Sequence, residues 1–165
     1  MSSAKISAAE VLQRLNAEHL TLCTAESCTG GLVGKLITDV PGASSVYVGG
    51  VISYTNAVKN NVLGVSRDTL AQYTAVSAET AGEMARGARR LLGADIAVSV
   101  TGLAGPDGDG TGRPVGLVYI ALDRAAGCLV QELYLAGDRA AVRGAAAQAI
   151  FALLLEALSN SEECL

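Results

Sequence analysis

One short stretch, Thr24–Gly31, constrains the fold of this 165-residue chain more than any other. An apolar run of β type, Leu20–Thr24, leads into a turn that carries Ser27, and Gly30 and Gly31 then begin a helix. A strand followed by a tight turn and a helix is the unit from which layered α/β folds are built. A serine at such a turn lies beside backbone N–H groups that no helical hydrogen bond satisfies, and these groups suit an oxyanion or a phosphate.

The segments around this stretch alternate between helical and strand-like patterns. Capping residues and apolar periodicity predict helices that start at Ser7, about Gly30, Asn56, Ser66, Ser77 and Asp138. Strand-type runs cover 20–24, 46–48, 50–54, 95–101, 115–122 and 128–135, with a bulge or turn at Gly49-Gly50 and a hairpin across 123–127. We expect one domain over residues 1–165, folded as a three-layer α/β/α sandwich with a mixed, mostly parallel sheet. The last helix is expected to end near Leu158, with the tail from about residue 159 frayed.

Composition favours a layered fold with a tightly packed interior. Half of the residues are hydrophobic but only 4% are aromatic, so we expect a core of mostly Ala, Val, Leu and Ile. Small side chains let helices approach a sheet closely. The N-terminus lacks a signal-peptide pattern and no apolar run approaches 18 residues, so we expect a cytoplasmic protein with no membrane partner.

Charge and metal-ligand content argue against two classes of function. The formal net charge is −4, and neutralising nucleic-acid phosphates requires clustered Lys and Arg, so we expect no nucleic-acid partner. The cysteines, Cys23, Cys28, Cys128 and Cys164, have no C-x-x-C spacing, and the chain has one histidine. We therefore expect reduced, buried thiols, no metal site and no cofactor.

The scarcity of histidine also limits how Ser27 can be activated. His19 falls in the polar end of the first helix with no obvious carboxylate to orient it, so a Ser-His-Asp triad is disfavoured. The alternative base is one of three lysines, of which Lys59 follows a strand and shares a helix face with Leu63. Partial burial by apolar neighbours lowers the pKa of a lysine and makes it a general base. A solvated lysine on the helix surface is the other interpretation.

A second Gly-rich segment, residues 101–114, follows the next strand-type run. Because ligands collect at the carboxyl ends of strands in open α/β sheets, we expect this segment and the Ser27 turn to border one crevice. The hydroxyl of Thr101 is a candidate partner for a catalytic lysine, although a long turn without a function is the alternative. Arg139 and Arg143 lie four residues apart at the start of the last helix, where they can either clamp a phosphate or remain solvated.

Seven motifs together indicate a family resemblance. They are, in chain order, residues 25–31 (AESCTGG), 41–45 (PGASS), 54–59 (YTNAVK), 75–77 (AVS), 101–108 (TGLAGPDG), 114–116 (PVG) and 137–139 (GDR). In this order they resemble the CinA C-terminal domain family, over about residues 8–158. The resemblance implies a stand-alone nicotinamide-nucleotide amidohydrolase, which converts nicotinamide mononucleotide (NMN) to nicotinic acid mononucleotide and ammonia.

The resemblance also implies roles for individual residues. Ser27 would be the nucleophile and Lys59 its base. Tyr54 and Thr101 would position and polarise this pair. The implied substrate contacts are Thr29, Gly30, Gly31, Gly102, Gly105 and, for the phosphate, Arg143. The expected partners are NMN as substrate and a second copy of the chain in a homodimer.

Three positions depart from the family pattern. Asp109 stands where the pattern Gly-Pro-Asp-Gly-Gly has its last Gly, and Arg113 stands where Lys precedes Pro-Val-Gly. Thr74 takes the place of Gly in Gly-Ala-Val-Ser. These changes bear on the shape of the long loop and on substrate affinity, and they leave Ser27 and Lys59 intact.

Two other functions compete with the amidohydrolase. The first is a non-catalytic module that binds a pyridine nucleotide in the same pocket and regulates a partner. The second is a cysteine hydrolase that uses Cys28, which the position of His19 disfavours because a catalytic thiol needs an adjacent base.

Overall fold

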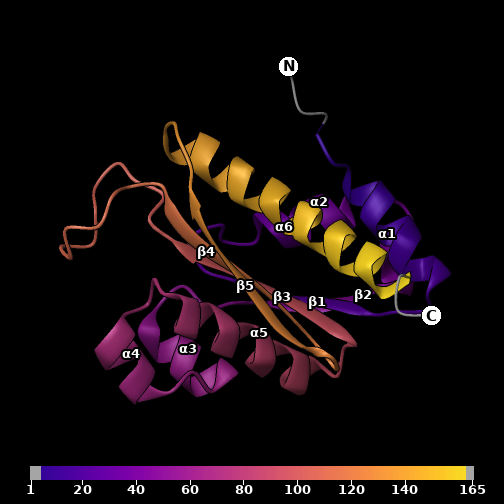
Figure 1. The fold of residues 1–165 in the computed structure, drawn as a ribbon, viewed down its shortest axis with the longest axis horizontal. Helices are drawn as coiled ribbons and strands as arrows, with labels where there is room; N and C mark the ends of the chain where they lie inside the picture. Colours follow the sequence, from indigo (N-terminus) through magenta and orange to yellow (C-terminus); the bar gives the residue numbers. More distant parts are fainter. Residues whose placement is uncertain (1–4, 163–165) are drawn as a thin grey trace.

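The computed structural model describes residues 5–162, which fold around one five-stranded sheet of order β2-β1-β3-β4-β5 (Figure 1). The strands are β1 (Leu22–Glu26), β2 (Tyr47–Ile52), β3 (Ile96–Gly102), β4 (Leu117–Arg124) and β5 (Gly127–Tyr134). β1 pairs in parallel with β2 and β3, whereas β4 is antiparallel to both β3 and β5. The sheet is therefore mixed, with β4 alone running against the other four strands.

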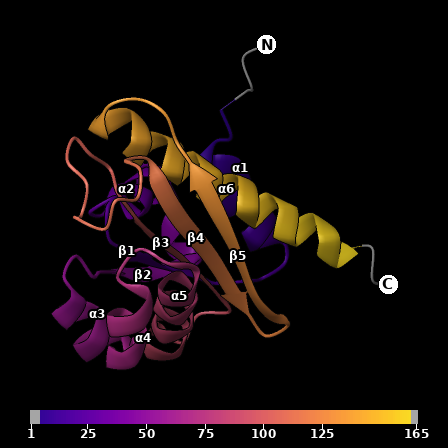
Figure 2. The ribbon, with the colours of Figure 1, turned by 60° about the vertical axis from the view of Figure 1, so that its left-hand side comes forward.

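Helices cover both faces of this sheet. They are α1 (Ala8–Ala17), α2 (Leu32–Thr38), α3 (Asn56–Leu63), α4 (Arg67–Tyr73), α5 (Ala78–Leu92) and α6 (Arg139–Glu162), with a 3₁₀ turn at Ala43–Ser45. Figures 1 and 2 show α1, α2 and α6 on one face and α3, α4 and α5 on the other. The predicted three-layer α/β/α architecture is confirmed.

The two largest apolar clusters of the described residues hold the layers together. The larger lies on the α6 face and includes Val98, Ile120 and Phe151. The smaller lies between the sheet and α5 and joins Leu63 of α3 to Met84 and other small or flexible side chains. Glycine at position 87 is required here, because a Cβ atom on Gly87 would overlap the carbonyl oxygen of Leu63. This close approach fixes the end of α3 against α5.

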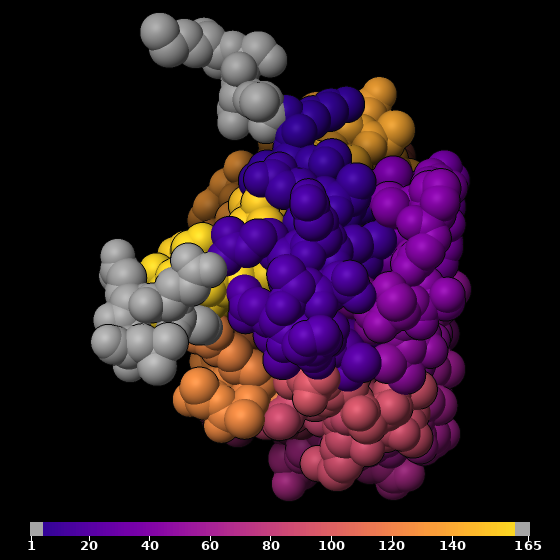
Figure 3. Space-filling model, turned by 90° about the vertical axis from the view of Figure 1, so that its right-hand side faces the viewer, coloured from indigo at the N-terminus to yellow at the C-terminus, as the bar shows by residue number. Residues whose placement is uncertain are grey.

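α6 is the one helix, among the residues described, that is long and apolar enough to span a membrane by length and composition alone. Half of its most apolar window is buried inside the protein, where Val142, Ile150 and Leu154 join the larger core. The core helices of globular proteins meet the same criteria, so we interpret α6 as a core helix. Figure 3 shows its last turns, in yellow, beside α1 in indigo, and side chains of both helices belong to one apolar cluster.

Element boundaries differ from the sequence predictions at both ends of the chain. β1 begins two residues later than predicted because His19 has a positive φ of 56° and the N–H of Leu20 donates to the carbonyl of Leu15. This is a Schellman motif, which still belongs to α1. α6 continues to Glu162, beyond the predicted end near Leu158, because no Gly or Pro interrupts it there. Residues 163–165, which include Cys164, lie outside the described residues.

Two further details change within the sheet and its connections. β2 is one continuous strand, and the predicted irregularity is a register shift in which Leu22 and Cys23 pair with Tyr47 and Gly49. Thr55, not Asn56, caps α3, since its hydroxyl accepts a hydrogen bond from the N–H of Val58 at 3.3 Å.

Candidate active site

The candidate site lies where three parallel strands end side by side. Ser27 directly follows β1, Ser53 follows β2, and Gly102 is the last residue of β3. The last residue of β1, Glu26, pairs with Ile52 on one side and Val100 on the other, so these carboxyl ends share one edge of the sheet. Loops at this edge form the crevice in which open α/β sheets bind ligands.

Ser27 and Lys59 meet at this edge. The N–H of Ser27 donates to the carbonyl of Val100 at 3.0 Å, which fixes the turn at the end of β1. From α3, the Nζ atom of Lys59 lies 2.8 Å from the Oγ atom of Ser27. It also donates to the carbonyl oxygen of Ser53 at 2.6 Å and, more weakly, to that of Tyr54 at 3.5 Å. A neutral amine in this position keeps its two protons on the carbonyls and offers its lone pair to the serine hydroxyl.

The environment of Lys59 favours this neutral form. Lys59 is only 1% exposed, and burial lowers its pKa from 10.5 to about 8. Desolvation penalises the ammonium ion more than the amine, and neither carbonyl partner carries a compensating charge. Lys59 and Leu63 form the buried face of α3, as the sequence predicted. The solvated interpretation of Lys59 is therefore wrong.

Glu26 holds the turn around Ser27. Its buried carboxylate accepts hydrogen bonds from the hydroxyl of Thr29 at 2.7 Å and from the backbone N–H groups of Val33 and Gly34 at 2.9 and 3.0 Å. A carboxylate at the first turn of α2 is stabilised by the helix dipole and satisfies donors that have no partner within the helix. Thr29 thus orients the turn through Glu26.

The two glycines of the turn provide its backbone geometry. Gly30 and Gly31 have φ values of 60° and 104°, and the N–H of Gly30 donates to the carbonyl of Ser27 at 3.1 Å. The backbone N–H groups of Cys28 and Thr29 have no hydrogen-bond partner among the described residues. Both N–H groups remain available to a ligand.

Arg143 of α6 is occupied by the same turn. Its Nε atom donates to the carbonyl of Cys28 at 3.1 Å, and its Nη2 atom donates to the carbonyl of Thr29 at 2.7 Å. The guanidinium therefore ties the serine turn to α6, and Arg143 is not among the residues that line the pocket. Arg143 is therefore connected to the pocket through the serine turn.

Of the two arginines at the start of α6, Arg139 is the one that lines the pocket. The pocket has a volume of about 170 Å³ and is lined by Ser27, Cys28, Tyr54, Lys59, Ala75, Val76, Thr101, Gly102, Ala104 and Arg139. Arg139 donates to the carbonyl of Gly105 at 2.7 Å and to the hydroxyl of Tyr54 at 3.1 Å. Hollows as large as about 500 Å³ lie elsewhere on the surface, whereas this pocket contains both Ser27 and Lys59.

Thr101 and Tyr54 both line the pocket, but neither side chain forms a hydrogen bond with Lys59. The hydroxyl of Thr101 donates instead to the carbonyl of Ala75 at 2.7 Å. The Tyr54 side chain is 57% exposed, and its backbone carbonyl, rather than its ring, accepts from Lys59. Glycine is required at position 102, because a Cβ atom there would lie 2.6 Å from a methyl group of Val118.

Cys28 lines the pocket beside Ser27 as a thiol. Burial raises the pKa of this cysteine to about 11, so the thiolate needed for nucleophilic attack is scarce at neutral pH. His19 is exposed in the turn after α1, and no hydrogen bond joins its side chain to the described part of the site. This geometry disfavours a cysteine hydrolase.

Comparison with known proteins agrees with the motif pattern. The sequence profile of the CinA C-terminal domain matches residues 4–158. The chain belongs to this family. A CinA-like protein of Geobacter sulfurreducens is 52% identical over 124 residues, and a CinA-like protein of a Synechococcus species is 53% identical over 132 residues. These matches cover 75% and 80% of this chain but only 30% and 31% of the relatives, so the chain spans about a third of their length.

Solved structures of the CinA superfamily share the fold over nearly the whole chain. A superfamily protein from Klebsiella pneumoniae superposes with a TM-score of 0.91 at 36% identity, covering 93% of this chain and 96% of that one. The competence/damage inducible protein CihA from Agrobacterium tumefaciens has a TM-score of 0.87 at 39% identity, covering 92% and 93%.

Sequence reasoning missed two contributors to this CinA-family site. Glu26 was part of a motif but had no predicted role, although an acidic residue just before a helix-starting turn is a recognisable capping signal. The carbonyl of Ser53 carries no sequence signal, because every residue has one. Gly105 also differs from its prediction, since it meets Arg139 through its carbonyl and is not part of the pocket lining.

Proposed function

We propose that this protein is an amidohydrolase that converts NMN to nicotinic acid mononucleotide and ammonia. One observation carries the proposal: the buried amine of Lys59 lies 2.8 Å from the Oγ atom of Ser27 inside a pocket. A serine attacks a carboxamide only when a base removes its proton, and a lysine with a pKa of about 8 can do so near neutral pH.

Acylation begins when the Oγ atom of Ser27 attacks the carboxamide carbon while its proton passes to the Nζ atom of Lys59. The carbonyl oxygen becomes an oxyanion, and the free N–H groups of Cys28 and Thr29 are the donors that stabilise it. When the tetrahedral intermediate collapses, the C–N bond breaks. Lys59 returns the proton to the leaving nitrogen, which departs as ammonia and leaves an ester on Ser27.

Deacylation repeats the same proton transfers with water. Lys59 takes a proton from a water molecule while the oxygen of that water attacks the ester carbon. The bond to Ser27 then breaks, Lys59 returns the proton to the serine oxygen, and the product forms as a carboxylic acid, which loses its remaining proton to solvent and leaves as a carboxylate. Each proton that Lys59 accepts is given back in the same half-reaction, so the dyad is regenerated without a cofactor.

The ribose phosphate of NMN requires a cation at the pocket, and Arg139 is the best candidate. Its guanidinium lines the pocket and is held in place by the carbonyl of Gly105 and the hydroxyl of Tyr54. A planar guanidinium that is already oriented binds a phosphate with little loss of side-chain entropy. We assign the phosphate to Arg139 in preference to Arg143, which serves the serine turn.

The test is to incubate the purified protein with NMN in the absence of added metal and to measure ammonia and nicotinic acid mononucleotide together. We expect both products in equal amounts and a loss of at least about 10³-fold in rate for Ser27→Ala. The matched control is Ser45→Ala, which removes an exposed hydroxyl that donates to the carbonyl of Gly42. Binding of NMN without turnover by the wild type would instead favour a pyridine-nucleotide-binding module.

A second measurement separates serine from cysteine chemistry. Alkylation of the thiols should leave the hydrolysis rate unchanged, unless bulk at Cys28 blocks the pocket. Cys28→Ala covers that case, since it removes the thiol without adding volume. Retained activity in Cys28→Ala, together with its loss in Ser27→Ala, identifies the nucleophile.

A further inference from the structure

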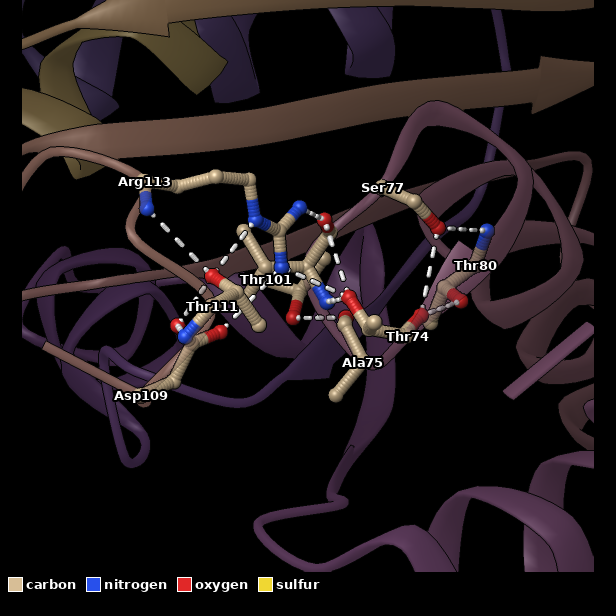
Figure 4. A network of polar contacts seen from close by, with 9 residues as sticks. Thr74, Ala75, Ser77, Thr80, Thr101, Asp109, Thr111 and Arg113 are labelled. Carbon is tan, nitrogen blue, oxygen red and sulfur yellow. Dashed lines mark hydrogen bonds and ion pairs between the residues drawn. The ribbon is translucent and has the colours of Figure 1, made fainter. Parts of the chain in front are cut away.

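Arg113 ties the loop between β3 and β4 to a segment far from it in the sequence. Its guanidinium donates to the carbonyl of Val76, to the hydroxyl of Thr74 at 2.6 Å and to the carboxylate of Asp109 at 3.1 Å (Figure 4). The Nε atom also donates to the hydroxyl of Thr111 at 3.0 Å. One side chain therefore holds both its own loop and residues 74–76, and we call this set of contacts the Arg113 latch.

The segment that the latch holds is a wall of the candidate active site. Ala75 and Val76 line the pocket together with Ser27 and Lys59. The carbonyl of Ala75 accepts the hydroxyl hydrogen bond of Thr101. Arg113 itself is not part of the pocket lining, so any effect that it has on the pocket passes through residues 74–76.

The wall needs outside support because its backbone is strained. Thr74 has φ 70° and ψ 177°, a conformation that residues with a side chain rarely adopt. Its carbonyl accepts hydrogen bonds from the hydroxyls of Ser77 and Thr80, and its own hydroxyl accepts from Arg113 (Figure 4). On the inner side, Val76 packs in a small apolar cluster with Leu103 and Leu117.

Asp109 completes the latch from within the long loop. Its carboxylate accepts hydrogen bonds from the backbone and hydroxyl of Thr111 and pairs with Arg113. Both charged side chains are 27% exposed, so solvent screens this pair less than a fully exposed one. Thr74, Asp109 and Arg113 are also the three positions that depart from the motif pattern, and the structure bonds them to one another.

We propose that Arg113 is a positioning residue which, with Asp109, fixes the Ala75–Val76 wall of the pocket and thereby sets the affinity for the nucleotide substrate. The proposal rests on the proposed function. Arg113 has no hydrogen bond to Ser27 or Lys59, so the latch acts on substrate binding and leaves the proton transfers of the dyad unchanged.

The experiment compares two aspartates of the same loop. Asp109→Asn breaks the ion pair of the latch, whereas Asp107→Asn changes an exposed carboxylate with no hydrogen bond or ion pair to the described residues. Arg113→Lys, a second test variant, keeps the positive charge but lacks the planar set of N–H donors of the guanidinium group. For each, we would measure KM and kcat for NMN, the pH profile, and amide hydrogen exchange over residues 74–77 and 103–116.

We expect Asp109→Asn and Arg113→Lys to raise KM about 3- to 10-fold, the range that follows from losing a partly exposed charged hydrogen bond. Their kcat should stay within about twofold of wild type, and the apparent pKa of kcat/KM should not move, because neither change touches Lys59. Amide exchange in residues 74–77 should become faster. Asp107→Asn should match the wild type in every measurement.

Two results would overturn the proposal. Unchanged exchange in both latch variants would mean that Arg113 does not hold the wall, and faster exchange with an unchanged KM would mean that the wall does not set affinity. Failure of the wild type to hydrolyse NMN would defeat the proposed function alone. The exchange data and the dissociation constant for NMN, measured by calorimetry in place of KM, would still decide the role of Arg113.

Discussion

The Nζ atom of Lys59 lies 2.8 Å from the Oγ atom of Ser27, although 32 residues separate them in the chain. α3 carries the lysine and the turn after β1 carries the serine. Their meeting depends on the parallel pairing of β1 with β2, which brings the two loops to the same edge of the sheet. Because the other partners of Lys59 are uncharged carbonyls, the pair can act as acid and base without a third ionised group.

The first prediction concerns the pH dependence of the rate. Burial lowers the pKa of Lys59 to about 8, and only its neutral form can accept the serine proton. The kcat/KM for NMN should therefore rise about tenfold per pH unit below pH 7 and level off above pH 8. Lys35→Met, which changes an exposed lysine paired with Asp39, should keep the same profile. A flat profile between pH 6 and 9 would contradict the role of Lys59.

The second prediction concerns the stability of the folded protein. The unfolded chain holds the Lys59 proton up to about pH 10.5, whereas the folded protein releases it near pH 8. Between these values the unfolded state binds more protons than the folded state, so the free energy of unfolding rises with pH. Below pH 8 Lys59 is charged in both states, and the cost of burying this charge lowers the stability by its full amount. Lys59→Met should abolish hydrolysis and raise Tm at pH 7 by about 3 °C or more. This gain should shrink towards pH 10, as thermal scans at both pH values will show.

The third prediction tests the support that Glu26 gives to the serine turn. Glu26→Gln keeps the shape of the side chain but replaces one carboxylate oxygen by an N–H₂ group. In the wild type the two oxygens accept hydrogen bonds from Thr29, Val33 and Gly34, and an N–H₂ group cannot accept them. We expect a loss of about 2–4 kcal/mol in the free energy of unfolding, measured in urea, together with a lower kcat. Glu79→Gln, at an exposed position in the first turn of α5, should cost less than about 1 kcal/mol. Equal effects from the two changes would argue against the special role of Glu26.

The fourth prediction distinguishes the two arginines of α6. Arg139→Met should raise KM for NMN about tenfold or more and have little effect on KM for nicotinamide riboside, which lacks the phosphate. Arg143→Met should instead lower Tm and kcat with both substrates, because it releases the carbonyls of Cys28 and Thr29. Steady-state kinetics with the two substrates and a thermal scan provide the comparison. An equal rise in KM for both substrates in Arg139→Met would show that Arg139 does not bind the phosphate.

The fifth prediction concerns the contact between α3 and α5. Gly87→Ala would place a methyl group on the carbonyl of Leu63, so the helices must separate, and we expect a loss of about 2 kcal/mol or more. Gly144→Ala, in α6, adds a methyl group in open space and should stabilise the protein by up to about 1 kcal/mol. Chemical denaturation should therefore show a lower free energy of unfolding for Gly87→Ala and a higher one for Gly144→Ala. Activity should fall with Gly87→Ala, because α3 carries Lys59.

Local sequence patterns are enough to predict the secondary-structure elements of this fold and the residue types of the site. Ser7, Ser66, Ser77 and Asp138 each cap the predicted helix, because capping depends on a side chain and the N–H groups two or three residues away. The scarcity of histidine and the position of Lys59 on an apolar helix face indicate lysine as the base from residue types and spacing alone.

Hydrogen bonds between groups that are distant in the chain depend on how the layers pack, and local sequence patterns do not predict them. Arg139 and Arg143 are equivalent in the sequence, but α6 crosses the serine turn so that one reaches the pocket and the other reaches two carbonyls. Thr101 bonds the carbonyl of Ala75 for the same reason, since the chain that passes beside it comes from another part of the sequence. Helix caps act within a few residues along the chain, whereas these partners are set by strand order and by the packing of the layers.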